Sequence, residues 1–116
     1  MSAKQPSSLR GLSPSKKSIS AAKRDAAWLD KIANQQDAKA LSDLFEIYGP
    51  KLKGWLMARG VGSGTAEDIV QDVMIKVWTR AVLFDPKKAS FATWVYRLTG
   101  FVTLIELVAI SFRLAS

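Results

Sequence analysis

The spacing of apolar side chains is the feature that most restricts how this sequence can fold. Apolar side chains recur at steps of three and four residues, first at Leu41, Leu44 and Tyr48 and again, in a later segment, at Ile69 and Val73. Such steps place side chains on one face of an α-helix. No long stretch alternates with period two, so we predict an all-α fold, a small bundle of three to four helices. The expected core residues are Trp28, Leu44, Phe45, Leu56, Ile69, Val73 and Val77.

Residues that start and stop helices divide the chain. Asp37, Thr65 and Ser90 are candidate N-caps, because each can accept a backbone hydrogen bond in the first turn. Pro50 predicts either a kink or the first turn of a resumed helix, and Gly60 predicts a helix end. The last predicted helix runs from Phe91 to about Leu98.

Two missing residue types exclude several classes of chemistry. The chain of 116 residues contains no Cys and no His, which rules out thiol nucleophiles, disulfides, His or Cys metal sites and His-based acid–base catalysis. Asp68 and Asp72 share a helix face near Glu67, but nothing else in the sequence supplies convergent metal ligands. We therefore expect a protein that is not an enzyme, with no cofactor and no metal, and that acts on no small-molecule substrate.

Positive charge is concentrated at the start of the chain. The net charge is +7, and residues 1–24 carry six basic residues and no acid. Residues 1–22 are rich in Ser, Lys and Pro, so we predict a disordered basic tail. This tail is either a solubilising leader or a segment that attracts nucleic acid without sequence preference. It has no apolar core of a secretory signal, and we expect a cytoplasmic protein.

Two segments carry a family resemblance. They are AEDIVQDVMIKVW, residues 66–78, and LFDPKKASFATWVYRL, residues 83–98. In this order, separated by a short loop, they resemble region 2 of bacterial RNA polymerase sigma factors, and the extracytoplasmic-function class most closely. We assign residues 24–98 to a sigma region 2-like helical domain. The resemblance implies a module that binds core RNA polymerase and engages and melts the promoter minus-ten element in transcription initiation.

The resemblance implies a polymerase-binding face on the helix that contains the first segment. In the family this helix binds the coiled coil of the β′ subunit. The matching residues here are Asp68, Gln71, Asp72 and Ile75, opposite Val70, Val73 and Val77. A face with acids, an amide and one exposed Ile suits a basic helical partner. The alternative is an acidic face that is merely solvated.

The resemblance also implies a promoter DNA site at the loop and the helix that follows it. The candidate DNA-binding residues are Phe84, Lys87, Lys88, Phe91, Trp94, Tyr96 and Arg97. Aromatic rings can stack on unpaired bases while neighbouring cations hold phosphates. The alternative is that Phe91, Trp94 and Leu98 form a buried stripe.

The sequence departs from the family after Leu98. Residues 99–116, TGFVTLIELVAISFRLAS, are apolar where the family has a basic DNA-facing continuation. We also expect a chain without the family's second DNA-reading domain. We consider a frameshift, a membrane segment and a helix that packs on the bundle, and we favour the frameshift. Phe101 to Phe112 is only twelve residues, whereas a membrane span needs about 20, so we expect no membrane span. The competing function is an inactive truncated fragment that acts only as an interaction module, binding polymerase or an anti-sigma factor.

Overall fold

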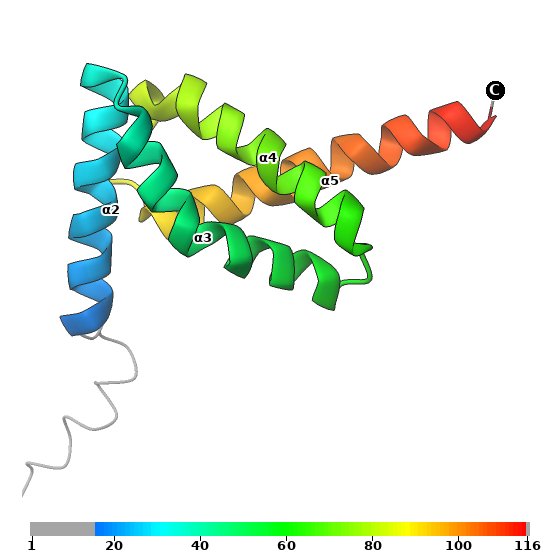
Figure 1. Ribbon diagram of the computed structural model, residues 1–116, viewed down its shortest axis with the longest axis horizontal. Coiled ribbons are helices and arrows are strands. Elements are labelled where there is room, and N and C mark those ends of the chain that lie inside the picture. Colours follow the sequence, from blue (N-terminus) through cyan, green and yellow to red (C-terminus); the bar gives the residue numbers. More distant parts are fainter. Residues whose placement is uncertain (1–15, 116) are drawn as a thin grey trace, which may run out of the picture.

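The computed structural model describes residues 16–115, and the helices make an all-α bundle (Figure 1). The elements are α2 (Lys16–Gln35), α3 (Ala38–Ala58), α4 (Ser63–Arg80), a 3-10 turn η2 (Ala81–Leu83) and α5 (Phe91–Ala115). No strand occurs within residues 16–115, which confirms the predicted fold class. The predicted disorder of residues 1–15 lies outside the described residues, whereas residues 16–22 belong to α2.

Both ends of α3 are fixed as the sequence predicts. The Asp37 carboxylate accepts hydrogen bonds from the N–H groups of Lys39 and Ala40, at 3.0 and 3.1 Å. At the other end Gly60 adopts a φ of 91°, a left-handed conformation that glycine tolerates at low cost. The N–H of Val61 then reaches the Leu56 carbonyl at 3.1 Å, which closes the last turn.

Pro50 lies inside α3 and does not begin a separate helix, so of the two alternatives predicted for it only a kink within one helix remains. Two other predicted boundaries differ in the structure. Helix α4 begins at Ser63 behind Gly62, so the prediction that Thr65 is its N-cap is wrong. Ser90 does cap α5, since its Oγ accepts from the N–H of Thr93 at 3.2 Å. However, α5 continues well past Leu98 to Ala115, because no proline or capping glycine interrupts it.

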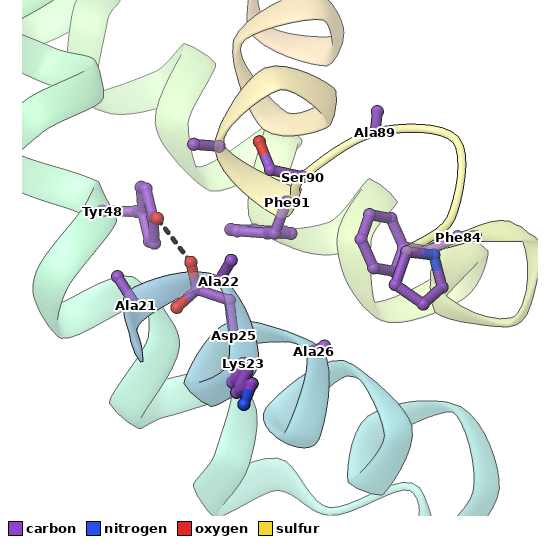
Figure 2. A pocket seen from close by; sticks show the side chains of 12 residues that line it. Ala21, Ala22, Lys23, Asp25, Ala26, Tyr48, Phe84, Ala89, Ser90 and Phe91 are labelled. Atoms are coloured by element: carbon purple, nitrogen blue, oxygen red, sulfur yellow. Dashed lines mark hydrogen bonds between the residues drawn. The ribbon is translucent and has the colours of Figure 1, made fainter. Parts of the chain in front are cut away.

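A buried polar contact attaches α2 to α3 (Figure 2). The Tyr48 hydroxyl donates to Asp25 Oδ2 at 2.5 Å, and the Asp25 side chain is only 2% exposed. Arg24 donates to the other carboxylate oxygen from Nε and Nη2, at 3.1 and 2.9 Å. Burial, followed by the hydrogen bond to Asp25, raises the pKa of Tyr48 above its ordinary range. The carboxylate is therefore paired although it is buried.

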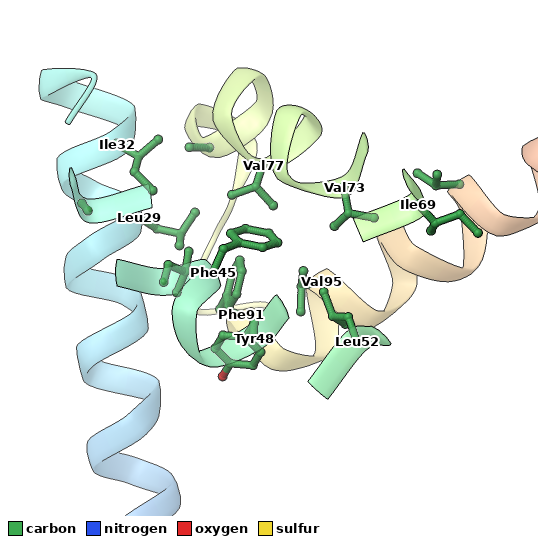
Figure 3. Packing of buried hydrophobic residues seen from close by; sticks show 14 of the residues in the cluster. Leu29, Ile32, Phe45, Tyr48, Leu52, Ile69, Val73, Val77, Phe91 and Val95 are labelled. Atoms are coloured by element: carbon green, nitrogen blue, oxygen red, sulfur yellow. The ribbon is translucent and has the colours of Figure 1, made fainter. Parts of the chain in front are cut away.

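The hydrophobic core lies where all four helices meet (Figure 3). Of the expected core residues, Leu44, Phe45, Leu56, Ile69, Val73 and Val77 are buried. Trp28 is only half-buried, with the Arg24 guanidinium 5.2 Å from its ring centroid. Helix α5 contributes Phe91, Val95, Thr99 and Val102, and beyond these residues it projects past the bundle (Figure 1).

Candidate functional site

The acidic face predicted on α4 is exposed as one surface. Asp68, Gln71, Asp72 and Ile75 all face solvent, and the Ile75 side chain is 57% exposed. The opposite side of the helix packs into the core through Ile69 and the valines that follow it. Neither Asp68 nor Asp72 makes a salt bridge within residues 16–115. Both carboxylates are therefore available to a basic partner.

One ion pair borders this surface. Lys53 Nζ on α3 lies 2.6 Å from Glu67 Oε1 on α4. The hydrogen bond and the charge of Lys53 hold the pKa of Glu67 below its usual range. Glu67 is thus engaged within the molecule, unlike its neighbour Asp68.

Three aromatic rings cluster at the start of α5. The ring centroid of Phe84 lies 5.3 Å from that of Trp94, and the Phe91 centroid lies 6.0 Å from that of Trp94. Phe91 is only 1% exposed and packs edge-on against Tyr48 at 5.0 Å. The prediction that Phe91 contacts DNA is therefore wrong, because a ring buried in the core cannot stack on a base. Phe84 and Trp94 remain half-buried at the surface.

A tight turn presents two lysines beside this cluster. The Asp85 carboxylate accepts the N–H of Lys87 at 2.9 Å, and the Asp85 carbonyl accepts the N–H of Lys88 at 3.0 Å. Both lysines are exposed. The rings of Phe84 and Trp94 and the two lysines thus lie on neighbouring segments, as the sequence predicts.

Arg97 and Tyr96 lie on different sides of α5. Arg97 lines a shallow groove of about 300 Å³ with Arg80, Trp94 and Phe101, so it does accompany the aromatic cluster. Tyr96 instead packs edge-on against Trp55 of α3, with ring centroids 5.6 Å apart. Tyr96 does not lie with the other predicted DNA-binding residues, because it is two positions from Trp94 and therefore about 200° away around the helix, where its ring contacts α3.

Sequence reasoning missed an open cavity of about 630 Å³ between α2, the loop and the start of α5 (Figure 2). Its lining includes Ala22 and Ala26 from α2, Pro86 from the loop and Phe91 from α5. Small side chains on α2 leave this space open. The alanines at positions 21, 22 and 26 are the available signal in the sequence, although alanine also has the highest helix propensity and needs no cavity to explain it.

Two further findings concern metals and membranes. Within residues 16–115 no group of three or more acidic side chains could hold a metal ion. Helix α5, with 25 residues and a mean hydropathy of 1.7 in its most apolar window, is long and apolar enough to cross a membrane by length and composition alone. This length includes the first half of the helix, which belongs to the bundle core, so the expectation of no membrane span stays a prediction.

Known proteins resemble this chain over the bundle. The family model Sigma-70 region 2 matches residues 44–104. The chain is 45% identical over 67 residues to the ECF RNA polymerase sigma factor RpoE of Cereibacter sphaeroides, which covers 58% of the chain and 37% of the relative. The chain thus spans little more than a third of this relative's length.

Two solved structures share the fold. One is Rhodobacter sphaeroides SigE in complex with the anti-sigma ChrR, with a TM-score of 0.62, 42% identity, and coverage of 63% of this chain and 42% of that one. The other is an engineered region 2 of sigmaE in complex with GTAAAA, with a TM-score of 0.68 and 32% identity. That match covers 78% of this chain and 92% of the solved one. The family match extends to residue 104, past the boundary predicted at Leu98.

Proposed function

The chain belongs to the Sigma-70 region 2 family, and from this premise we propose that it binds core RNA polymerase and engages the promoter minus-ten element in transcription initiation. The observation that carries the proposal is the similarity to the engineered region 2 of sigmaE in complex with GTAAAA. That match covers 78% of this chain and 92% of the solved domain, so it extends over nearly the whole of that domain rather than one motif.

Polymerase binding is assigned to the exposed face of α4. Asp68 and Asp72 lie one turn apart on it, with Gln71 and Ile75 beside them. Free carboxylates around one exposed apolar side chain suit a basic helix, since the apolar contact contributes affinity and the charges set orientation. The ion pair of Glu67 with Lys53 fixes the edge of this face to α3.

DNA engagement is assigned to Phe84, Trp94, Lys87, Lys88 and Arg97. A half-buried ring that is held by a second ring is rigid, so it loses little conformational freedom when a base stacks on it. Stacking contributes about 1–3 kcal/mol per base, and the lysines add phosphate contacts that weaken with salt. Phe91 supports this surface from below, through its contacts with Trp94 and Tyr48.

The test is fluorescence anisotropy with a labelled single-stranded GTAAAA oligonucleotide. Trp94→Ala should weaken binding by about 5- to 150-fold, which corresponds to about 1–3 kcal/mol. Trp78→Ala is the matched control, because Trp78 is also half-buried but lines a groove with Ala38 and Leu41 of α3 rather than the groove of Trp94 and Arg97. Equal losses in both variants, or no binding by the wild-type chain, would contradict the assignment.

The lysines are tested separately. Lys87→Gln with Lys88→Gln should weaken binding and flatten its salt dependence, because about two phosphate contacts are lost. The control is Lys31→Gln with Lys39→Gln, which removes the same charge from exposed positions on α2 and α3. A salt slope that changes equally in both pairs would mean that only net charge matters.

A second candidate is an interaction module that binds an anti-sigma factor or polymerase without promoter engagement. The similarity to SigE in complex with the anti-sigma ChrR favours it. Such a chain would bind core polymerase or an anti-sigma protein in a pull-down and yet show no preference for GTAAAA over a scrambled strand. The two functions are thus separated by the anisotropy experiment.

A further inference from the structure

The second half of α5 is apolar on nearly every side. This half projects past the bundle, and Val102 is its last buried side chain (Figure 1). The large apolar side chains that α5 exposes to solvent, each between 49% and 83% exposed, are Phe101, Leu104, Ile105, Leu107, Val108, Phe112 and Leu114. A helix that is apolar all round is normally buried, and an exposed apolar surface of this extent marks a binding site.

The exposed apolar area is large enough for an interface between protein chains. A large side chain that is half exposed offers on the order of 100 Å² of surface, so these seven side chains offer roughly 700 Å². A standard protein–protein interface buries about 800 Å² on each partner. One neighbouring helix covers only the side that faces it, so complete burial of this surface needs more than one neighbour.

Two charged side chains restrict which helix can pack on this surface. Glu106 and Arg113 are the only charged residues beyond Leu98, and they lie seven positions apart, which is two turns on the same side of the helix. Because their signs are opposite, a copy of this helix that runs in the opposite direction can place its Arg113 level with Glu106 and its Glu106 level with Arg113. A copy that runs in the same direction places like charges level with each other. The charge pattern therefore favours an antiparallel copy.

The register that pairs these charges also suits the apolar side chains and the shape of the chain. With the charges level, Ile105 lies level with Leu114 of the second copy, and Leu107 lies level with Phe112 of that copy. The described part of α5 in the second copy ends one position before the level of Thr103. The two projecting halves therefore overlap along their described length, and the two bundles lie at opposite ends of the pair. A parallel pair would bring both bundles to the same end.

We propose that the projecting half of α5 packs antiparallel against the same segment of a second copy of this chain. The charge of the folded part does not oppose this association, because residues 25–116 carry eleven basic and ten acidic side chains, a net charge of +1. The apolar sides that one pair leaves open allow two pairs to pack together as a four-helix bundle. Dimers and tetramers built from antiparallel pairs are therefore the expected species.

The first experiment is sedimentation equilibrium of the full chain and of charge-reversed variants. Glu106→Arg and Arg113→Glu should each weaken association about tenfold or more, because each replaces two attractive contacts of the antiparallel pair with two repulsive ones. The double variant that carries both substitutions should associate as the wild type does, since it restores opposite charges at both contacts. Glu46→Arg is the matched control, because it makes the same charge change at an exposed site on α3 and should leave association unchanged.

The second experiment measures the direction of the two helices. Because the chain has no cysteine, Ala109→Cys and Thr103→Cys each give a single site for a pyrene label, and both positions are half-buried. In the antiparallel pair the two labels at position 109 lie almost level, whereas the two labels at position 103 lie about 20 Å apart along the axis. Pyrene excimer emission should therefore appear at position 109 and not at position 103.

Three outcomes would overturn the proposal. A wild-type chain that stays monomeric at its highest soluble concentration has no such interface. Excimer emission at both positions would indicate a parallel pair. Association that neither charge reversal weakens, or that the double variant does not restore, would mean that apolar side chains aggregate without the proposed register. Circular dichroism of each variant shows that its bundle is folded before association is compared.

Discussion

Removing one hydroxyl group from the core should show how much the buried contact between α2 and α3 contributes. Tyr48→Phe deletes the donor that lies 2.5 Å from Asp25 Oδ2 and changes little else in volume. Asp25 is 2% exposed, but Asp25 and Tyr48 both line the open cavity between α2 and the start of α5, so water that enters from this cavity would reduce the loss. A buried acceptor left without its partner costs about 1–3 kcal/mol.

That loss is large for a domain of this size. A domain of about 100 residues has a total stability of roughly 5–15 kcal/mol. The predicted loss should lower Tm by about 4–8 °C per kcal/mol, measured by circular dichroism during thermal or urea unfolding. Tyr96→Phe is the matched control, because it removes the same atom from the only other tyrosine of the chain, whose ring packs on Trp55 at the surface.

The same contact predicts an alkaline dependence. Burial and the hydrogen bond to Asp25 raise the pKa of Tyr48, so the folded state holds its proton more tightly than the unfolded state. The stability that the protonated Tyr48 hydroxyl adds to the folded state is fully present below the ordinary tyrosine pKa of about 10. It decreases as pH rises above that value. The difference between wild type and Tyr48→Phe should therefore narrow above about pH 10. Equal stability of Tyr48→Phe and Tyr96→Phe at neutral pH would refute the reasoning.

Three other substitutions test the core, the α4 face and its border. Phe45→Ala should cost about 2–5 kcal/mol, seen as a large loss of Tm, because Phe45 is 8% exposed and packs in the core. Asp72→Arg should weaken binding to core polymerase by about 1–3 kcal/mol in an affinity titration, whereas Glu46→Arg, an equally exposed charge reversal on α3, should not. Lys53→Met should leave Tm nearly unchanged, because its ion pair with Glu67 is at the surface and screened by water.

The periodic core could be predicted from sequence, whereas side-chain roles near the loop could not. Leu44 and Val77 follow helical spacing so regularly that burial was the simplest expectation. Phe91 follows the same spacing, but the family resemblance implies a role in DNA binding for it. The packing of its ring against Tyr48 shows that it belongs to the core. The sequence did not indicate that Asp25 is buried, because an acid within a basic segment is expected at the surface. Its hydrogen-bond partner, Tyr48, is 23 positions away in the sequence.

The extent of α5 changes how the unusual C-terminal residues are interpreted. The sequence suggested a break at Thr99, with a frameshift as the favoured cause. Yet Thr99 is fully buried and donates from Oγ1 to the Val95 carbonyl at 2.7 Å, and Val102 is only 4% exposed. These two residues continue the stripe of Phe91 and Val95, and the family match extends to residue 104. The frameshift after Leu98 stays a prediction for residues 99–116, to be tested by translating the other frames of the gene.

Two shortened chains locate the end of the domain. A chain ending at Leu98 loses the buried side chains of Thr99 and Val102, and burial of a valine alone contributes about 1.5–3 kcal/mol. A chain ending at Glu106 keeps both and loses mainly the exposed side chains beyond. We expect the longer chain to melt near the temperature of the full chain and the shorter one well below it, by circular dichroism. If the chain ending at Leu98 is as stable as the full chain, Thr99 and Val102 add nothing to the core, and the domain ends where the sequence first suggested.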